Sequence, residues 1–290
     1  MILSTTTDSV FETFGYENGI RLLAKLGFDA LDLNLIHPIY EAEFSEENYE
    51  STCLKLKQWA EDNNIYFNQA HAPFPSYRFG DDEYNEKVKP ALIRSIKAAG
   101  LVGAKQIVVH PTACPDSVDQ KEFNIEFYNS LLPYAKEAHT KIALENMWGF
   151  DSAQNKIVPN VCSFGRELAD FFDALDPEYF TVCLDVGHCG LVGQTAEAAI
   201  FELGGQRLCA LHVHDNDNVR DLHTIPYQGK INWDAVMTAL KCMEYDGDFT
   251  YEVGGHFLST YKNEPELMVK ALELMVTTGR ILIAKYDNAF

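Results

Sequence analysis

Positive charge is scarce in this chain of 290 residues. It has 23 Lys and Arg against 43 Asp and Glu, so its formal net charge is −20. Proteins that hold nucleic acids or anionic membranes do so through clustered Lys and Arg. The composition therefore argues against a nucleic-acid or membrane partner, although bound metal ions could supply positive charge at a local nucleic-acid site.

Long apolar runs and paired cysteines are also lacking. No apolar run reaches the roughly 18 residues that a membrane span needs. The segment Met1–Thr7 has no positively charged start followed by a long apolar stretch, so we expect no signal peptide. The seven cysteines are scattered, odd in number and without a C-x-x-C pair, which argues against a disulfide scaffold or a structural zinc knuckle. We expect a cytoplasmic protein.

What is present is an ordinary globular composition, 47% hydrophobic and 23% charged, with a regular rhythm. Short apolar runs rich in β-branched residues recur about every 30 to 40 positions, with longer amphipathic stretches between them. We predict strands at Met1–Thr5, Ala30–Leu35, Ile65–His71, Gln106–His110, Lys141–Asn146, Thr181–Val186, Leu208–His214 and Phe249–Val253.

Helices are predicted in the intervals between these strands. Amphipathic spacing indicates helices over Tyr49–Asn64 and Phe123–Ala138. Glycine is a frequent helix stop because it accepts positive φ. We therefore predict that three further helical segments end at a glycine: Leu22–Leu26 at Gly27, Ile93–Ala99 at Gly100 and Ala196–Leu203 at Gly204.

The alternation of strand and helix predicts βαβ units and a parallel sheet. Eight such units in 290 residues fit a closed (β/α)8 TIM barrel, and no low-complexity linker interrupts them. We therefore predict an α/β fold with a single TIM-barrel domain over residues 1–290. An open doubly wound sheet is the alternative, but it normally carries a Gly-rich turn after its first strand, and Ser4–Val10 is not such a turn.

Ligand-type side chains follow six of the predicted strands. Catalytic residues of a TIM barrel lie at the carboxyl ends of its strands, and the residues found there are His71, His110, Glu145, Asp185, His188, His212, His214, Asp221, His223 and Glu252. Imidazole combined with carboxylate suits Zn, Mn, Fe or Co. Glu145 and Asp185 lie in apolar runs, where a charge costs several kcal/mol unless it is paired or metal-bound. The pattern predicts a metal site.

Other residues near these strand ends are less specific. Arg220 could hold a substrate hydroxyl or phosphate or remain a solvated loop residue. Trp148 and Phe74 could form walls of a substrate pocket, although aromatic side chains usually pack. The run Pro226–Trp233 is interpreted as a structural turn in which Asn232 caps the following helix.

The order and spacing of these motifs resemble the xylose isomerase-like TIM-barrel superfamily, which contains sugar isomerases and epimerases, inosose dehydratase and endonuclease IV. The resemblance runs from about Ile20 to Met268 and is most specific at Ala143–Asn146, Leu184–His188, His212–Asp215 with Asp221–His223, and Tyr251–Val253. It implies one divalent ion held by Glu145, Asp185, Glu252 and one of two histidines. The His-x-x-Asp spacing favours His212, whereas counting back from Arg220 favours His214.

The resemblance further implies a metal-dependent isomerase or epimerase of carbohydrate metabolism that acts on a ketose or polyol. The ion would acidify the C–H next to a carbonyl, and Glu145 and Glu252 would move the proton through an enediolate. His188 and Arg220 would hold substrate hydroxyls between the walls formed by Trp148 and Phe74. A homo-oligomer is compatible with this sequence. A barrel that binds a sugar or metal without turnover is a distant third hypothesis.

Endonuclease IV-like members supply the second hypothesis. They hold two more zinc ions, and all five matching residue types are present, at His71, His110, His188, Asp221 and His223. The resemblance thus allows one to three ions per chain and a zinc-dependent phosphodiesterase acting on abasic DNA. The acidic composition and the lack of Lys- or Arg-rich loops weigh against it.

Overall fold

The computed structural model describes residues 1–289 and contains one eight-stranded parallel sheet. The strands are β1 (Leu3–Thr6), β2 (Ala30–Asn34), β3 (Tyr66–His71), β4 (Gln106–Val108), β5 (Lys141–Glu145), β8 (Phe180–Asp185), β9 (Leu208–His212) and β10 (Phe249–Tyr251). Each lies where the sequence predicts a strand. Their spatial order is β10-β1-β2-β3-β4-β5-β8-β9.

The sheet closes on itself. Val213, just beyond β9, donates its backbone N–H to the Thr250 carbonyl at 2.8 Å and accepts one from Glu252 at 3.1 Å. This parallel bridge joins the two outer strands of the sheet. The fold is therefore a TIM barrel, as predicted, and the open doubly wound alternative is wrong.

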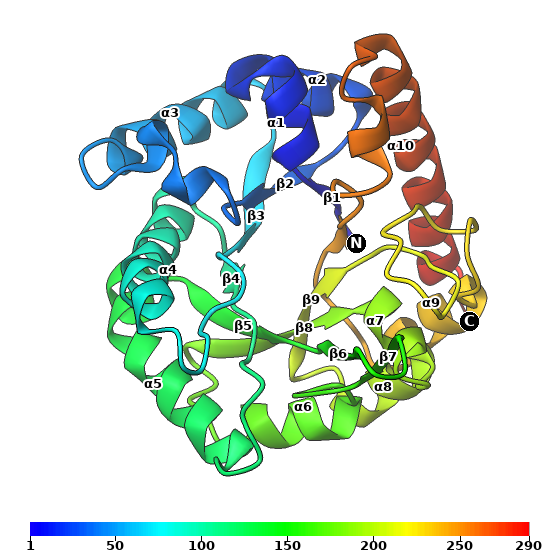
Figure 1. Ribbon diagram of the computed structural model, residues 1–290. Coiled ribbons are helices and arrows are strands. Elements are labelled where there is room, and N and C mark those ends of the chain that lie inside the picture. The colour runs from blue at the N-terminus through cyan, green and yellow to red at the C-terminus, as the bar shows by residue number, and fades with distance from the viewer. Residues whose placement is uncertain (290) are drawn as a thin grey trace.

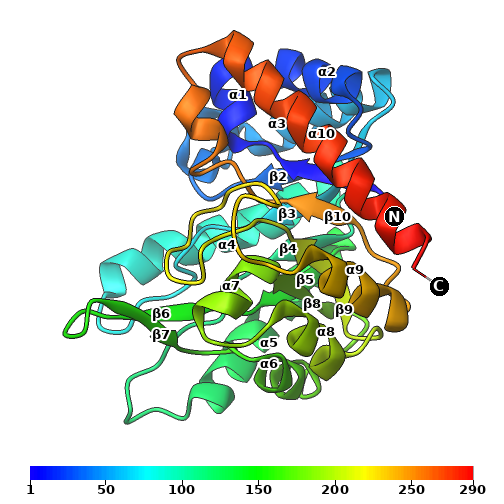
Figure 2. The same ribbon diagram turned by 90° about the vertical axis from the view of Figure 1, so that its right-hand side faces the viewer.

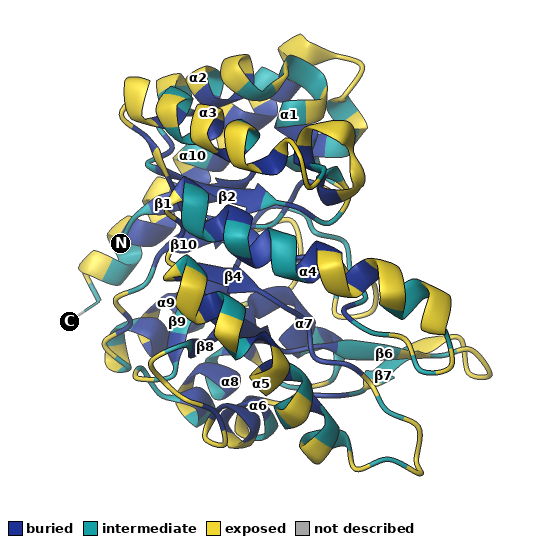
Figure 3. Cartoon of the chain, turned by 90° about the vertical axis from the view of Figure 1, so that its left-hand side faces the viewer, coloured by how far each residue is buried: buried dark blue, intermediate teal, exposed yellow. Residues whose placement is uncertain are grey.

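Helices form a ring around the barrel (Figure 1). They are α1 (Asp8–Phe14), α2 (Tyr16–Leu26), α3 (Tyr49–Asp62), α4 (Asp82–Val102), α5 (Gln120–Ala138), α6 (Gly165–Phe172), α7 (Val186–Leu191), α8 (Ala196–Leu203), α9 (Trp233–Cys242) and α10 (Pro265–Asp287), with short 3-10 turns at Pro38–Tyr40, Ala42–Phe44 and Leu258–Tyr261. Their outer faces are exposed, whereas the strands are buried (Figure 3). No helix within residues 1–289 is long and apolar enough to cross a bilayer.

Glycine marks helix ends in two of the three predicted places. Gly27 follows α2 with a φ of 104°, and Gly204 follows α8 with a φ of 72°. The predicted stop at Gly100 is wrong, because α4 continues to Val102 and ends at Gly103. A Cβ on Gly100 would lie 2.2 Å from the Ala138 carbonyl oxygen, so this glycine allows α4 to pack closely against α5.

Polar side chains fill the amino end of the barrel interior. Ser4 donates to the Asn68 side-chain oxygen at 2.7 Å, and the Asn68 amide donates to Asp248 at 3.0 Å and Thr250 at 3.3 Å. Small residues, Val108, Ala143, Cys183 and Ala210, form a separate buried cluster.

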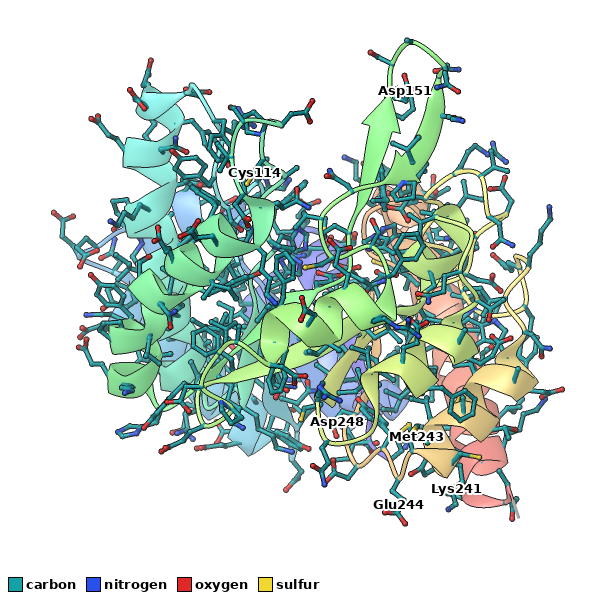
Figure 4. The ribbon with its side chains drawn as sticks, turned by 90° about the horizontal axis from the view of Figure 1, so that it is seen from below. Cys114, Asp151, Lys241, Met243, Glu244 and Asp248 are labelled. Carbon is teal, nitrogen blue, oxygen red and sulfur yellow. The ribbon has the colours of Figure 1, made fainter. Side chains whose placement is uncertain are left out.

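An antiparallel hairpin, which the sequence analysis did not predict, follows β5. It consists of β6 (Trp148–Asp151) and β7 (Lys156–Pro159) and extends away from the barrel (Figure 2). Because it starts just after the last residue of β5, it marks the carboxyl end of the barrel. Figure 4 shows Asp151 near the tip of the hairpin and Asp248 at the opposite end of the molecule.

Candidate metal and active site

All ten ligand-type residues predicted from the strand ends meet at the carboxyl mouth of the barrel. They form overlapping groups in which one ligand atom per residue lies within 4.8 Å of the others. We call three of them the central group (Glu145, Asp185, His212, Glu252), the first flanking group (His71, His110, Glu145) and the second flanking group (His188, His214, Asp221, His223). A further set of His71, His212 and Glu252 links the first two.

The central group is organised around His212, which is fully buried. Its Nδ1 lies 2.8 Å from Glu145 Oε1 and 3.5 Å from Glu252 Oε2. Glu145 ends β5 and Glu252 follows β10, so the two carboxylates reach His212 from different sides of the barrel. Asp185 ends β8, where its carboxylate caps α7 by accepting the His188 N–H at 2.8 Å. Three buried or mostly buried carboxylates and one imidazole are a donor set that suits a divalent transition metal.

The first flanking group brings two imidazoles to the other oxygen of Glu145. His110 Nε2 lies 2.7 Å from Glu145 Oε2 and 3.0 Å from His71 Nε2. His71 Nδ1 donates to the carbonyl of Ala72 at 2.8 Å, which leaves the Nε2 lone pair directed into the group. A backbone partner of this kind fixes the tautomer of a metal-binding histidine.

Backbone carbonyls also fix two histidines of the second flanking group. His188 Nδ1 donates to the Asn146 carbonyl and His223 Nδ1 to the Glu252 carbonyl, both at 2.8 Å. Their Nε2 atoms lie 3.5 and 3.1 Å from Asp221 Oδ2. Asp221 Oδ1 is buried and has no hydrogen-bond partner within residues 1–289. A cation would satisfy this oxygen, so these residues also fit a metal.

His214 contacts Asp185 but does not belong to the central group. Its Nε2 lies 2.9 Å and 3.0 Å from the two Asp185 oxygens, and its ring stacks on His223 with centroids 3.8 Å apart. A Cβ on Gly187 would lie 2.0 Å from His214 Cε1, so only glycine fits there. Of the two histidines that the sequence left open, the geometry places His212 in the central group.

Charges in the cluster balance one another. Burial raises the pKa of Glu252 to about 8, and the charges of Glu145 and Asp185 add to this shift. Burial opposes protonation of His223, but its hydrogen bond to Asp221 and the charge of Glu252 raise its pKa to about 9. Burial, followed by the charges of two neighbouring histidines, lowers the pKa of His71 to about 3. Protonated imidazoles thus supply part of the positive charge that the carboxylates require.

The predicted substrate-binding side chains are only partly brought to this mouth. Trp148 Nε1 donates to Asp221 Oδ2 at 3.2 Å, and Phe74, 48% exposed, packs its ring 4.6 Å from that of His110. Arg220 instead forms two hydrogen bonds with Asp217 Oδ2, at 2.9 and 2.7 Å, and its side chain is 70% exposed. The guanidinium of Arg220 is thus paired with Asp217, although Arg220 lines a cavity together with Trp148 and Asp221 of the second flanking group.

A cavity of about 450 Å³ opens beside the central group, with Glu252 and His223 among its walls. Other walls come from the segments after β1 and β2 and include Asp8, Glu12, Phe11, Tyr16, His37, Glu41 and Phe44. None of the described residues that line it is Lys or Arg. These wall residues were not predicted from the sequence, although Asp8 follows the first strand and belongs to the strand-end residues of a barrel.

Comparison with known proteins identifies related chains. The model of one protein family, described as xylose isomerase-like TIM barrel, matches residues 20–277. Protein y4fM of Sinorhizobium fredii is 26% identical over 196 residues, which cover 64% of this chain and 60% of y4fM. MJ1311 of Methanocaldococcus jannaschii is 26% identical over 192 residues, covering 63% and 62% of the two chains. The chain thus spans about three fifths of the length of these curated relatives.

Solved structures share the fold. The IolI protein with a bound zinc atom superposes with a TM-score of 0.77 at 16% identity, covering 99% of both chains. L-ribulose 3-epimerase superposes with a TM-score of 0.74 at 13% identity, covering 99% of this chain and 95% of the epimerase. D-psicose 3-epimerase in the presence of D-fructose superposes with a TM-score of 0.73 at 16% identity, covering 97% of this chain and 99% of the epimerase. At these identities the likeness establishes the TIM-barrel fold.

Proposed function

The chain belongs to the xylose isomerase-like TIM-barrel family, and from its site we propose that it is a metal-dependent isomerase or epimerase of an unphosphorylated ketose. The central group carries this proposal. Glu145 Oε1 and Glu252 Oε2 lie 2.8 and 3.5 Å from the same nitrogen of His212, so a sugar bound to an ion held there would lie within reach of two carboxylates. The sugar epimerases among the structural neighbours support the choice of reaction.

Glu145, Asp185, His212 and Glu252 are the residues that would hold the ion. When bound, a divalent ion would hold the carbonyl and adjacent hydroxyl oxygens of the sugar and acidify the C–H between them. One glutamate would accept that proton and the other would return a proton to the opposite face of the carbon. Hydroxyls beyond this carbon would lie in the cavity, where Tyr16 and His37 offer hydrogen-bonding groups and Phe11 and Phe44 offer apolar walls.

The cavity supports a neutral substrate. Asp8, Glu12, Glu41 and Glu43 line it together with Glu252, without a Lys or Arg among its described walls. A phosphate group there would face several carboxylates without a counter-charge. We therefore propose free ketoses over sugar phosphates.

The test is exchange of substrate hydrogen with deuterated solvent, followed by NMR on metal-loaded protein with free ketohexoses and ketopentoses. We expect exchange at one carbon and loss of about 10²–10⁴-fold in rate for Glu145→Gln or Glu252→Gln. Glu273→Gln, at an exposed residue bonded to Lys270, is the matched control and should remain within twofold of wild type. Undiminished exchange by Glu145→Gln would refute the assignment.

The two flanking groups favour a second candidate function, a multinuclear zinc phosphodiesterase. Their seven side chains converge on the same mouth, although one ion is enough for the proton transfer proposed above. Several zinc ions would neutralise a phosphodiester and activate the attacking water. Elemental analysis distinguishes the two candidates: one ion per chain supports the isomerase, whereas three zinc ions together with cleavage of abasic-site DNA would support the phosphodiesterase.

A further inference from the structure

Asp32 is a buried carboxylate that the proposed reaction does not use. It lies in the middle of β2 with 1% exposure, between Leu31 and Leu33. Its Oδ2 accepts one hydrogen bond, from Gln69 Nε2 at 3.2 Å. Its Oδ1 has no hydrogen-bond partner within residues 1–289. A carboxylate this deeply buried costs several kcal/mol unless other groups compensate its charge.

His212 lies next to this carboxylate. Asp32 Oδ2 lies 3.6 Å from His212 Nε2, and His212 Nε2 is itself buried and has no hydrogen-bond partner among the described residues. The gap is longer than a hydrogen bond, but a movement of about 0.6 Å closes it to an ordinary N–H···O distance. Asp32 belongs to none of the potential metal-ligand groups found among residues 1–289, so it contacts the ring from outside the ion position.

The two nitrogens of His212 therefore face different carboxylates. Nδ1 faces Glu145 and Glu252 in the central group, and Nε2 faces Asp32 inside the barrel. A neutral imidazole carries one N–H and one lone pair. Without an ion, Glu145 Oε1 at 2.8 Å draws a proton to Nδ1. With an ion in the central group, the Nδ1 lone pair would go to the ion, and the acceptor beside Nε2 would hold the one remaining proton there.

We propose that Asp32 is a positioning residue that holds His212 in the Nε2–H tautomer, so that His212 binds the metal through Nδ1. Gln69 holds Asp32 in turn through its amide N–H. The inference rests on the proposed function only in requiring that the central group bind a divalent ion. It adds a carboxylate–histidine–metal chain that runs from β2 through β9 to the mouth of the barrel.

The first experiment measures Mn²⁺ affinity of the full chain by competition with a chelator. Loss of an outer-shell partner of this kind costs about 10–100-fold in metal affinity, so Asp32→Asn should raise the Kd for Mn²⁺ by that factor. Asp248→Asn is the matched control, because Asp248 is also buried and accepts a hydrogen bond from Asn68 at the other end of the barrel (Figure 4). The control should change the Kd by less than twofold.

The second experiment uses the wild-type chain, so it does not depend on whether a variant folds. With ¹⁵N-labelled histidine and Cd²⁺ in place of Mn²⁺, NMR identifies the nitrogen of His212 that binds metal, with His212→Gln used for assignment. We expect Nδ1 bound and Nε2 protonated. Binding through Nε2, an unchanged Kd in Asp32→Asn, or no binding of Mn²⁺ would overturn the inference. Metal binding as expected without hydrogen exchange on any ketose would refute the proposed reaction and leave the role of Asp32 intact.

Discussion

Replacing Gly187 with alanine has two opposing effects on stability, a gain in helix propensity and a steric clash with His214. Gly187 lies in α7, and glycine in a helix is about 0.5–1 kcal/mol less favourable than alanine. Helix propensity alone therefore predicts that Gly187→Ala stabilises the protein. The structure predicts the opposite sign, because the new Cβ would lie 2.0 Å from His214 Cε1 and 2.6 Å from its Nε2.

The size of the destabilisation follows from the movement that the imidazole ring of His214 must make. Its ring must move by about 1.4 Å to reach the 3.4 Å of ordinary contact, while Asp185 cannot follow freely because its backbone and carboxylate are bonded to Asn146 and to the His188 N–H. Overpacking costs about 1–3 kcal/mol, and a lost hydrogen bond to a charged group about 1.5–3 kcal/mol. We expect Gly187→Ala to lower the free energy of unfolding by about 3–5 kcal/mol.

Urea denaturation of a double-mutant cycle tests this reasoning. In a His214→Ala background the ring is gone, so Gly187→Ala should there be neutral or stabilising by up to about 1 kcal/mol. Gly255→Ala is a control with open space around the new Cβ and should change stability by less than about 1 kcal/mol. If Gly187→Ala had the same effect with and without His214, the steric explanation would be wrong.

Three further predictions concern pH, metal and a helix cap. Because the pKa of Glu252 is raised from 4.5 to about 8 in the folded state, the metal-free protein should lose stability as pH rises from about 4.5 to 8, and Glu252→Gln should flatten that part of the Tm profile. EDTA should lower the free energy of unfolding by about 2.7 kcal/mol when the ion removed was present at a hundred times its Kd, and added Mn²⁺ should restore it. Asn232→Ala should cost about 1 kcal/mol in urea denaturation, because the Asn232 side chain caps α9 by accepting the Ala235 N–H, with no change in the Kd for Mn²⁺.

The sequence predicted the barrel well because its strands are buried on both faces. Such strands are nearly continuous apolar runs, and each of the eight was found within about two residues of its observed ends. The β6–β7 hairpin was missed because it lacks such apolar runs. Its strands are half-buried or exposed, with Phe150 57% exposed, so no apolar run marks them.

The candidate site was predictable as a set of residues because the carboxyl ends of barrel strands converge whatever the details of packing. Its internal order was not predictable. His212 and His214 are two residues apart, so both point to the same side of their strand, and only the contact of His214 with Asp185 separates them. Asp32 was not predicted, although it is a charged residue in an apolar strand, because it lies in the middle of β2 and not at its carboxyl end.

The two proposed functions would use the same ligand residues and differ in the number of metal ions that these residues hold. Glu145 offers Oε1 to His212 in the central group and Oε2 to His110 in the first flanking group. An ion in the flanking group would share the Glu145 carboxylate with the central ion, so each ion would receive less of its negative charge, and the two ions would repel each other. The same bridge would withdraw electron density from Glu145 and make it a weaker base for proton transfer. Filling the flanking group should therefore weaken binding of the central metal and slow exchange of the sugar hydrogen, so the isomerase chemistry is favoured when the central group alone holds an ion.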